Sequence, residues 1–149
     1  MASRRTMPMK KIKIKYSNGA YHLKKIKKGD MIDCANLEPI EMKKGEFKLI
    51  NLGFACELPK GYMALLFPRS STYKKYGLIQ ANSIGVIDNS FSSDEDIWHF
   101  PVIATRDISI PANTRLCQFY IVKQQPRLNF IEVSHLDNKV RGGFGSTGA

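Results

Sequence analysis

The chain has 149 residues, of which 43% are hydrophobic and 24% are charged, and its formal net charge at pH 7 is +10. This length and composition are typical of one globular domain with its own core, so we expect residues 1–149 to form a single domain. No apolar run approaches the ~18 residues of a membrane-spanning helix, and no signal peptide is evident, so we expect a cytoplasmic protein without a membrane anchor.

The first predicted element is a strand over residues 11–16, where lysines alternate with apolar residues. The alternation predicts one apolar face and a row of solvated lysines, which also discourages pairing with other chains. Because residues 1–28 are rich in Lys and Arg, a nucleic-acid patch is the alternative interpretation. No aromatic residue is interleaved among Lys10, Lys11, Lys13 and Lys15 to stack on bases. We therefore favour a solvated strand in a protein that attracts anions, and we expect residues 1–10 to be a flexible leader.

Short runs of strand-forming residues follow, separated by turn signals such as Ser17-Asn18-Gly19 and Pro59-Lys60-Gly61. One helix of about two turns is predicted over 70–77, with Ser70 at its start and Gly77 at its end. This pattern predicts an all-β fold, a distorted jelly-roll barrel of short strands with one short helix. The other predicted strands cover residues 30–35, 46–54, 62–67, 78–82, 84–88, 97–105, 115–122 and 128–133. The glycine-rich end, residues 137–149, is predicted to be a mobile arm.

The three cysteines, Cys34, Cys56 and Cys117, are odd in number and lie far apart in apolar stretches. Their spacing does not match a zinc site, and this usage favours free thiols in a reducing compartment over a disulfide framework.

The stretch Pro68-Arg69-Ser70-Ser71 lies between a predicted strand and the short helix. A helix N-terminus has free N–H groups that suit a phosphate, and an arginine adds a planar fork for an oxyanion. The alternative is a capped helix beside a surface arginine.

Residues 82–88, Asn-Ser-Ile-Gly-Val-Ile-Asp, have the pattern of a β-hairpin. Backbone N–H and C=O groups at such a turn can imitate the edge of a base and read another base. Asp88 stands at the end of a predicted strand, where a carboxylate can act as a general base. The alternative is an aspartate that only forms a turn.

Two further stretches carry candidate ligand-binding groups. Gln118 lies among apolar residues of the strand 115–122, where its amide needs a partner or a ligand. Residues 141–148, Arg-Gly-Gly-Phe-Gly-Ser-Thr-Gly, combine a charge, glycines that let the backbone approach an anion, and two hydroxyls. Phe144 adds a ring whose stacking on a base is worth ~1–3 kcal/mol. The alternative is a disordered tail.

Taken in order, these stretches and Asp33 resemble the five motifs of the trimeric dUTPase family, the deoxyuridine 5'-triphosphate nucleotidohydrolases, over residues 11–148. The third and fifth stretches are the most specific, and the branch found in bacilli and their phages is the most similar. The resemblance implies a jelly-roll homotrimer with shared active sites that hydrolyses dUTP to dUMP and pyrophosphate with Mg²⁺. Such an enzyme keeps uracil out of DNA and supplies dUMP for thymidylate synthesis.

The resemblance also implies roles for matching residues. Asp88 would activate the attacking water, and Asp33 would support the magnesium shell through water. Arg69 and Gln118 would act on the phosphates, and Phe91 would lie under the deoxyribose. The remaining residues implied to bind substrate are Ser70, Ser71, Asn82, Gly85, Ile87, Arg141, Phe144, Gly145, Ser146 and Thr147.

The chain departs from the family pattern in several places. Residues 31–34 read Met-Ile-Asp-Cys instead of Gly-Tyr-Asp-Leu, Ser71 replaces a glycine, and residues 92–96 replace a short Arg-Gly. Because the arm is also shorter than usual, either Phe144 or an aromatic near Trp98 could cover the uracil.

Two alternatives to this function remain open. A dCTP deaminase-like enzyme would require a glutamate on the strand 97–105, which has none. A nucleotide-sensing regulatory protein would keep the pocket without turnover, and Asp88 argues against it.

Overall fold

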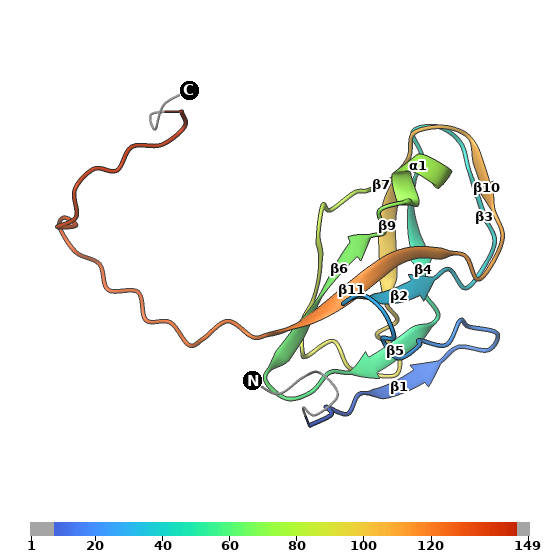
Figure 1. Ribbon diagram of the computed structural model, residues 1–149, viewed down its shortest axis with the longest axis horizontal. Coiled ribbons are helices and arrows are strands. Elements are labelled where there is room, and N and C mark those ends of the chain that lie inside the picture. The colour runs from blue at the N-terminus through green and yellow to red at the C-terminus, as the bar shows by residue number, and fades with distance from the viewer. Residues whose placement is uncertain (1–7, 146–149) are drawn as a thin grey trace.

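The computed structural model describes residues 8–145, which form short β-strands and one short helix (Figure 1). The strands are β1 (Lys13–Tyr16), β2 (Ile32–Ala35), β3 (Ile40–Met42), β4 (Phe47–Asn51), β5 (Phe54–Glu57), β6 (Tyr62–Pro68), β7 (Leu78–Gln80), β8 (Gly85–Ile87), β9 (His99–Ala104), β10 (Ile108–Ile110) and β11 (Arg115–Lys123), and the helix is α1 (Thr72–Tyr76). In the described part of the chain, no helix has the length and apolar character needed to cross a membrane.

The strands pair in antiparallel sheets that join distant parts of the sequence. The largest sheet has the order β2-β11-β6-β8, and a smaller one has the order β4-β9-β7. Two further pairs, β1-β5 and β3-β10, complete the body. Because β11 lies between β2 and β6, it brings the strand that carries Asp33 beside the strand that precedes Arg69.

The core lies between these sheets and is rich in aromatic side chains. Phe54, Trp98 and Phe119 are at most 2% exposed, and their rings pack with centroid separations of 4.9–6.5 Å. Burying rings of this size removes large apolar areas from water, which is the main force that holds small sheets together. The three cysteines are free and buried, as expected.

The short helix is where the sequence predicts it. Gly77 ends it in the left-handed region, at φ 63°, and donates its N–H to the carbonyl of Tyr73 at 2.7 Å. A Cβ at Gly77 would lie 2.9 Å from Oγ1 of Thr105, so glycine is required for close packing as well as for conformation. The predicted start at Ser70 is wrong by one residue, since the N-cap position is Ser71, whose side chain makes no capping bond.

The structure corrects the strand predictions at several places. The predicted strand 46–54 is two strands, β4 and β5, because Gly53 has φ 78° and donates its N–H to Oδ1 of Asn51 at 2.7 Å. The strands β3 and β10 were not predicted. Residues 128–133, which were predicted as a strand, lie outside regular secondary structure and have no neighbouring strand to pair with in this subunit.

Beyond β11 the chain leaves the body of the subunit (Figure 1). Apolar side chains along this segment are strongly exposed, with Phe130 at 91% and Val140 at 97%. Apolar groups in water are unfavourable, so this extended segment exposes apolar surface that the described residues of the chain do not cover.

Candidate active site

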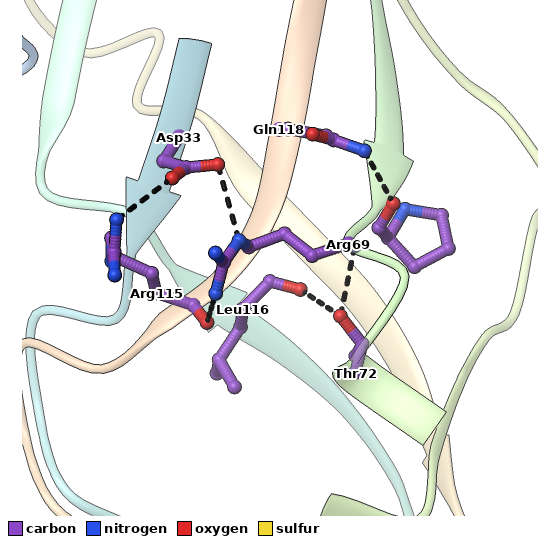
Figure 2. Close-up of polar contacts among 7 residues, drawn as sticks. Asp33, Arg69, Thr72, Arg115, Leu116 and Gln118 are labelled. Atoms are coloured by element: carbon purple, nitrogen blue, oxygen red, sulfur yellow. Dashed lines mark hydrogen bonds and ion pairs between the residues drawn. The ribbon is translucent and has the colours of Figure 1, made fainter. Parts of the chain in front are cut away.

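An ion-paired cluster forms where β2, β11 and the end of β6 meet (Figure 2). Nε of Arg69 lies 3.2 Å from Oδ1 of Asp33, and Nη1 of Arg115 lies 3.2 Å from Oδ2 of the same carboxylate. Arg69 also donates from Nη1 to the carbonyl of Arg115 at 3.3 Å. The side chains of Arg69 and Asp33 are only 27% and 25% exposed, so this pairing is less screened than one on an open surface.

The strand register explains why these groups meet. Gln118 on β11 pairs with Asp33 on β2 and with Phe67 on β6, so the three positions form one row across the sheet. Nε2 of Gln118 donates to the carbonyl of Pro68 at 3.2 Å. Gln118 therefore has a hydrogen-bond partner for its amide, as its place among apolar residues requires. The second hydrogen of that amide group remains for a ligand.

Thr72 fixes the turn that carries Arg69. Its Oγ1 accepts the N–H of Arg69 at 2.8 Å and donates to the carbonyl of Leu116 at 2.6 Å. The Thr72 side chain is 1% exposed, so both bonds are protected from water. This buried hydroxyl attaches the loop before α1 to the start of β11. Ser70 is exposed and Ser71 partly exposed in the same loop.

The predicted hairpin at residues 82–88 is only partly regular. Strand β8 pairs with β6 through Gly85 opposite Leu66, and residues 81–84 form the tight turn before it. Ser83 has φ 62°, and the N–H of Ile84 bonds to the carbonyl of Asn82 at 2.6 Å. A Cβ on Gly85 would lie 2.9 Å from Cβ of Leu66, so a larger residue would push the hairpin off β6. Asn82 is exposed, and Ile87 is partly buried at the end of β8.

Asp88 and Phe91 belong to one anchored turn after β8. The N–H of Phe91 donates to the carbonyl of Asp88 at 3.0 Å. Asn89 holds the turn to the body, since its Nδ2 donates to the carbonyls of Pro59 at 2.9 Å and Tyr62 at 2.8 Å. Asp88 is exposed and Phe91 is 37% exposed, so both side chains are accessible beside the hairpin.

Within one subunit Asp88 lies far from the ion-paired cluster. Ala64 of β6 lies opposite Ile87, the residue before Asp88, and Pro68 at the end of β6 is the residue before Arg69. A strand rises ~3.3 Å per residue, so the ends of this stretch are separated by more than ~13 Å along β6. The structure therefore does not bring the predicted base together with Arg69 and Gln118 in the same subunit.

The arm does not close over this subunit either. Arg141 and Gly145 are exposed, and Phe144 is fully exposed and has φ 50°. The predicted contacts of Ser146 and Thr147 lie outside the described residues. Figure 1 shows the described part of the arm, residues 137–145, well away from the strands of the body, β6 included.

The alternative uracil cover near Trp98 is not supported by the packing. Trp98 is 0% exposed, and its ring contacts Phe54 and Phe119 in the core. It therefore cannot reach a ligand without unpacking the subunit, which leaves Phe144 and the partly exposed Phe91 as accessible rings.

Residues 92–96, which replace the family's Arg-Gly, form an ordered acidic turn. The N–H of Ser93 donates to Oδ2 of Asp96 at 2.9 Å, and this bond with the backbone lowers the pKa of Asp96. Asp94 pairs with Lys15 at 3.2 Å, although both side chains are largely exposed. The extra length therefore packs toward β1 rather than toward the ion-paired cluster.

Sequence reasoning missed Arg115 and Thr72. Arg115 begins the same strand as Gln118, and a second cation three residues from a candidate phosphate ligand was the available signal. Thr72 gave no such signal, because threonine is common at helix starts and its bond to the Leu116 carbonyl joins residues 44 positions apart that only the tertiary fold brings together.

The described residues contain no group of three or more His, Cys, Asp or Glu side chains placed to hold a metal ion. Asp33 is the predicted metal-supporting carboxylate, and both of its oxygens are engaged by arginines. A direct protein-only metal cage is therefore not formed by the described part of this subunit.

Comparison with known proteins identifies the relatives of the chain. The dUTPase family profile matches residues 12–148. A prophage-derived deoxyuridine 5'-triphosphate nucleotidohydrolase of Bacillus subtilis is 51% identical over 138 residues, covering 92% of this chain and 97% of that protein. The deoxyuridine 5'-triphosphate nucleotidohydrolase of Rickettsia akari is 38% identical over 117 residues, covering 77% of this chain and 78% of that protein.

Solved structures show the same fold at lower identity. The dUTPase of Staphylococcus bacteriophage 80alpha, determined with dUpNHpp, has a TM-score of 0.76 and 20% identity, covering 95% of this chain and all of that chain. The dUTPase of Streptococcus mutans has a TM-score of 0.68 and 21% identity, covering 78% of this chain and 98% of that chain. The predicted all-β jelly-roll fold is thus confirmed.

Proposed function

The chain belongs to the dUTPase family, and from this premise we propose that it is a dUTP diphosphatase that hydrolyses dUTP to dUMP and pyrophosphate. The observation that carries the proposal is the oriented guanidinium of Arg69, held by Asp33 beside Gln118 within a chain that is 51% identical to a named dUTP nucleotidohydrolase. The dCTP deaminase-like alternative is not favoured. The chain matches dUTP nucleotidohydrolases, and its strand 97–105 lacks the glutamate that a deaminase would require.

The phosphate side of the site is built from the end of β6 and from β11. Arg69 uses Nε and Nη1 within the subunit, so its Nη2 is directed to a ligand in this proposal. Gln118 contributes its second amide hydrogen, and the hydroxyls of Ser70 and Ser71 lie in the same loop as Arg69. Donors fixed before the substrate arrives stabilise developing negative charge without reorganising during the reaction.

The base and sugar side is built from the hairpin and the turn after it. The backbone around Gly85, with Asn82 and Ile87, reads the edge of uracil, and the close packing of Gly85 on Leu66 of β6 holds this backbone in place. Phe91 lies under the deoxyribose, and the turn bond to Asp88 keeps that ring close to the catalytic carboxylate.

Asp88 is the general base of the proposed mechanism. Its carboxylate orients a water molecule and accepts its proton while the water attacks the α-phosphorus, and pyrophosphate leaves. A positioned base of this kind contributes ~10²–10⁴-fold to the rate. The charge that develops on the phosphoryl oxygens is stabilised by Arg69, Gln118 and, from the arm, Arg141.

The separation of Asp88 from Arg69 along β6 supports an active site shared between subunits. A homotrimer in which one subunit supplies Asp33, Arg69 and Gln118, another the hairpin, and the third the arm would unite these groups. The exposed apolar side chains of the sheet and of the segment after β11, including Val86, Tyr120 and Phe130, would be covered in such an assembly. Arg141, Phe144, Gly145, Ser146 and Thr147 would then close over a neighbour's substrate.

Asp33 is the one carboxylate of the ion-paired cluster, and in this proposal it supports a hydrated magnesium ion. Mg²⁺ prefers oxygen ligands, keeps several waters and is usually held by substrate phosphates with one or two carboxylates. The lack of a three-carboxylate group in the described residues agrees with a metal held mainly by the triphosphate, with Asp33 acting through water. When bound, Mg²⁺ neutralises part of the phosphate charge and fixes the conformation of the triphosphate.

The organisation of the chain follows from these assignments. We propose that residues 1–149 act as one domain in the cytoplasm, that residues 1–10 precede the folded body, and that residues 137–149 are the arm. Neither a nucleic acid nor a membrane is needed for this function.

The direct test is pyrophosphate release from dUTP, compared with dTTP, dCTP and UTP, with and without Mg²⁺. We expect rapid release from dUTP alone and a large loss when Mg²⁺ is removed. Tight binding of dUTP without turnover would favour the nucleotide-sensing alternative instead.

A further inference from the structure

The segment between β1 and β2 forms a hollow beside Asp33. Its volume is about 220 Å³. We call residues 24–28, Lys-Lys-Ile-Lys-Lys, the lysine loop. The residues that line the hollow together with the four lysines of this loop include Tyr21, Asp33 and Arg115.

The lysine loop carries a positive charge that the described residues do not pair. All four lysine side chains are exposed, and none makes an ion pair with a described carboxylate. Lys24 instead lies 5.5 Å from the centre of the Tyr21 ring. Asp33 contributes a negative charge, but Arg69 and Arg115 offset it. Asp30, two residues after the loop, makes an interaction of its own. Even with its negative charge included, the four lysines and Arg115 leave the hollow positive.

The hollow is continuous with the ion-paired cluster. Asp33 and Arg115 belong to both. Figure 2 shows Arg115 on one side of Asp33 and Arg69 on the other, with Gln118 beyond Arg69. A cation therefore lies on each side of the carboxylate. An anion chain that begins at Arg69 can therefore extend toward the lysine loop without meeting an uncompensated negative group.

We propose that the lysine loop and Arg115 form a subsite for a diphosphate chain, which receives the terminal phosphates of dUTP and retains the pyrophosphate product after cleavage. This inference rests on the proposed function. The confined hollow suits a short, highly charged anion, and the mobile ammonium groups of lysine contact phosphate oxygens without demanding one geometry. A single-stranded nucleic acid is a poorer occupant, because it requires a long groove with stacking rings, and Tyr21 is already engaged by Lys24.

The test compares two variants that lose the same positive charge. One replaces Lys24, Lys25, Lys27 and Lys28 with glutamine, and the matched control makes the same change at the exposed Lys11, Lys13, Lys60 and Lys123, which do not line the hollow. Binding of inorganic pyrophosphate and of dUMP is measured by calorimetry at fixed ionic strength on the full chains. Inhibition of dUTP turnover by pyrophosphate is measured in parallel.

We expect the lysine-loop variant to bind pyrophosphate about tenfold more weakly, the combined effect of several exposed charge contacts. Its dUMP affinity should be unchanged, and the control should change by less than about twofold, as for long-range steering alone. A fall in the affinity for a non-hydrolysable dUTP analogue would show that the bound substrate tail uses the subsite, and an effect on free pyrophosphate alone would show that only the product does.

Equal losses in both variants would show that net charge alone is responsible and would overturn the subsite, as would unchanged pyrophosphate binding in both. Loss of single-stranded DNA binding with unchanged pyrophosphate binding would assign the loop to a nucleic acid and overturn it too. Because calorimetry reads pyrophosphate binding directly, these outcomes are independent of whether the wild type hydrolyses dUTP.

Discussion

The carboxylate of Asp33 lies 3.2 Å from Nε of Arg69, although 36 positions separate the two residues along the chain, and this contact sets the direction in which the guanidinium faces (Figure 2). Asp33 thus has a positional role in addition to any contact with a hydrated metal. The pairing also explains how an arginine at the end of a strand stays oriented in the absence of phosphate.

Replacing Arg69 with lysine tests this arrangement. The variant keeps the positive charge but loses the planar fork that contacts Asp33 and the Arg115 carbonyl together, so we expect kcat for dUTP to fall by ~10²-fold with an unchanged fold. Circular dichroism checks the fold. Arg106→Lys is the matched control, because Arg106 is exposed and contacts the Lys75 carbonyl away from the cluster. Wild-type kcat in Arg69→Lys would remove Arg69 from the mechanism.

Asp88→Asn separates binding from catalysis. The substitution is nearly isosteric and removes the base but not the pocket, so affinity for a non-hydrolysable dUTP analogue should stay within about tenfold while kcat falls by ~10²–10⁴-fold. Single-turnover kinetics and equilibrium binding measure the two quantities. Asp94→Asn, in the acidic turn nearby, serves as the control and should keep its turnover. A normal rate in Asp88→Asn would contradict the assigned role.

Much of the fold could be predicted because local signals agree with the tertiary structure. The left-handed Gly77 ends the helix as its position after Lys74 and Lys75 predicts, and the strand 62–67 corresponds to β6. Where the predictions failed, the deciding information was not local. The left-handed turn at Gly53 is kept free of a side chain by the sequence-distant Ala20, whose Cβ would lie 2.8 Å from an added Cβ. Residues 128–133 have strand-forming residues but no strand beside them.

The candidate site was predictable as a set of residues and not as a geometry. The motifs around Arg69, Asp88 and Gln118 can be read from residue types and their order. The contact between Asp33 and Arg69 cannot, because it depends on the register in which β11 pairs with β2 and with β6. The distance between Asp88 and Arg69 likewise follows from which end of β6 the hairpin joins, and this distance supports the proposal of a shared site.

Truncation after Val140 tests the sharing. Because residues 141–145 extend away from the body, their removal should leave a folded assembly with poor catalysis. Mixing these truncated chains with Asp88→Asn chains should restore part of the activity, since mixed trimers can combine an intact arm with an intact Asp88. Mass spectrometry establishes that mixed trimers are present. If verified mixed trimers recover no activity, each subunit works alone.

The buried cysteines make stability depend on alkaline pH. Burial raises the pKa of the Cys56 thiol from 9.0 to about 12, with a further contribution from Cys34, and burial also raises the pKa of Cys117. Below pH 9 both states are protonated, so the thiols have no pH-dependent effect. Above pH 9 the unfolded chain ionises and the folded one does not, so stability is lost as pH rises, by up to ~1.4 kcal/mol per pH unit for each thiol.

Urea unfolding between pH 8 and pH 11, with reductant and at one subunit concentration, measures this loss. Other groups titrate in the same range, so the comparison is with Cys56→Ala, whose stability should fall less steeply above pH 9. The difference in unfolding free energy between the two proteins should therefore shrink as pH rises. A constant difference over this range would show that Cys56 ionises equally in both states.

Phe91→Ala tests how the sugar is selected. Phe91 is 37% exposed, and its backbone N–H donates to the carbonyl of Asp88, so both residues belong to the same turn. A ring held flat under the deoxyribose leaves no room for a 2′-hydroxyl and offers it no hydrogen bond. Burying a hydroxyl without a partner costs ~1–3 kcal/mol, and steric overlap adds to this cost. UTP should therefore be a poor substrate, mainly in kcat/KM.

Removing the ring should reduce this preference for dUTP by about tenfold or more, which corresponds to the lower part of the hydroxyl penalty. Turnover of dUTP should fall as well, because the sugar loses the surface that positions the α-phosphate. The readout is the ratio of kcat/KM for dUTP to kcat/KM for UTP, measured in the wild type and in Phe91→Ala. Phe47→Ala is the matched control, since Phe47 is 58% exposed on β4 and should leave the ratio unchanged. Since Phe91 has no hydroxyl to donate, the selection depends on shape alone, and a Phe91→Leu variant that fills part of the same volume should fall between the wild type and Phe91→Ala. An unchanged ratio in Phe91→Ala would mean that the sugar is selected elsewhere and that this ring serves only to pack the turn.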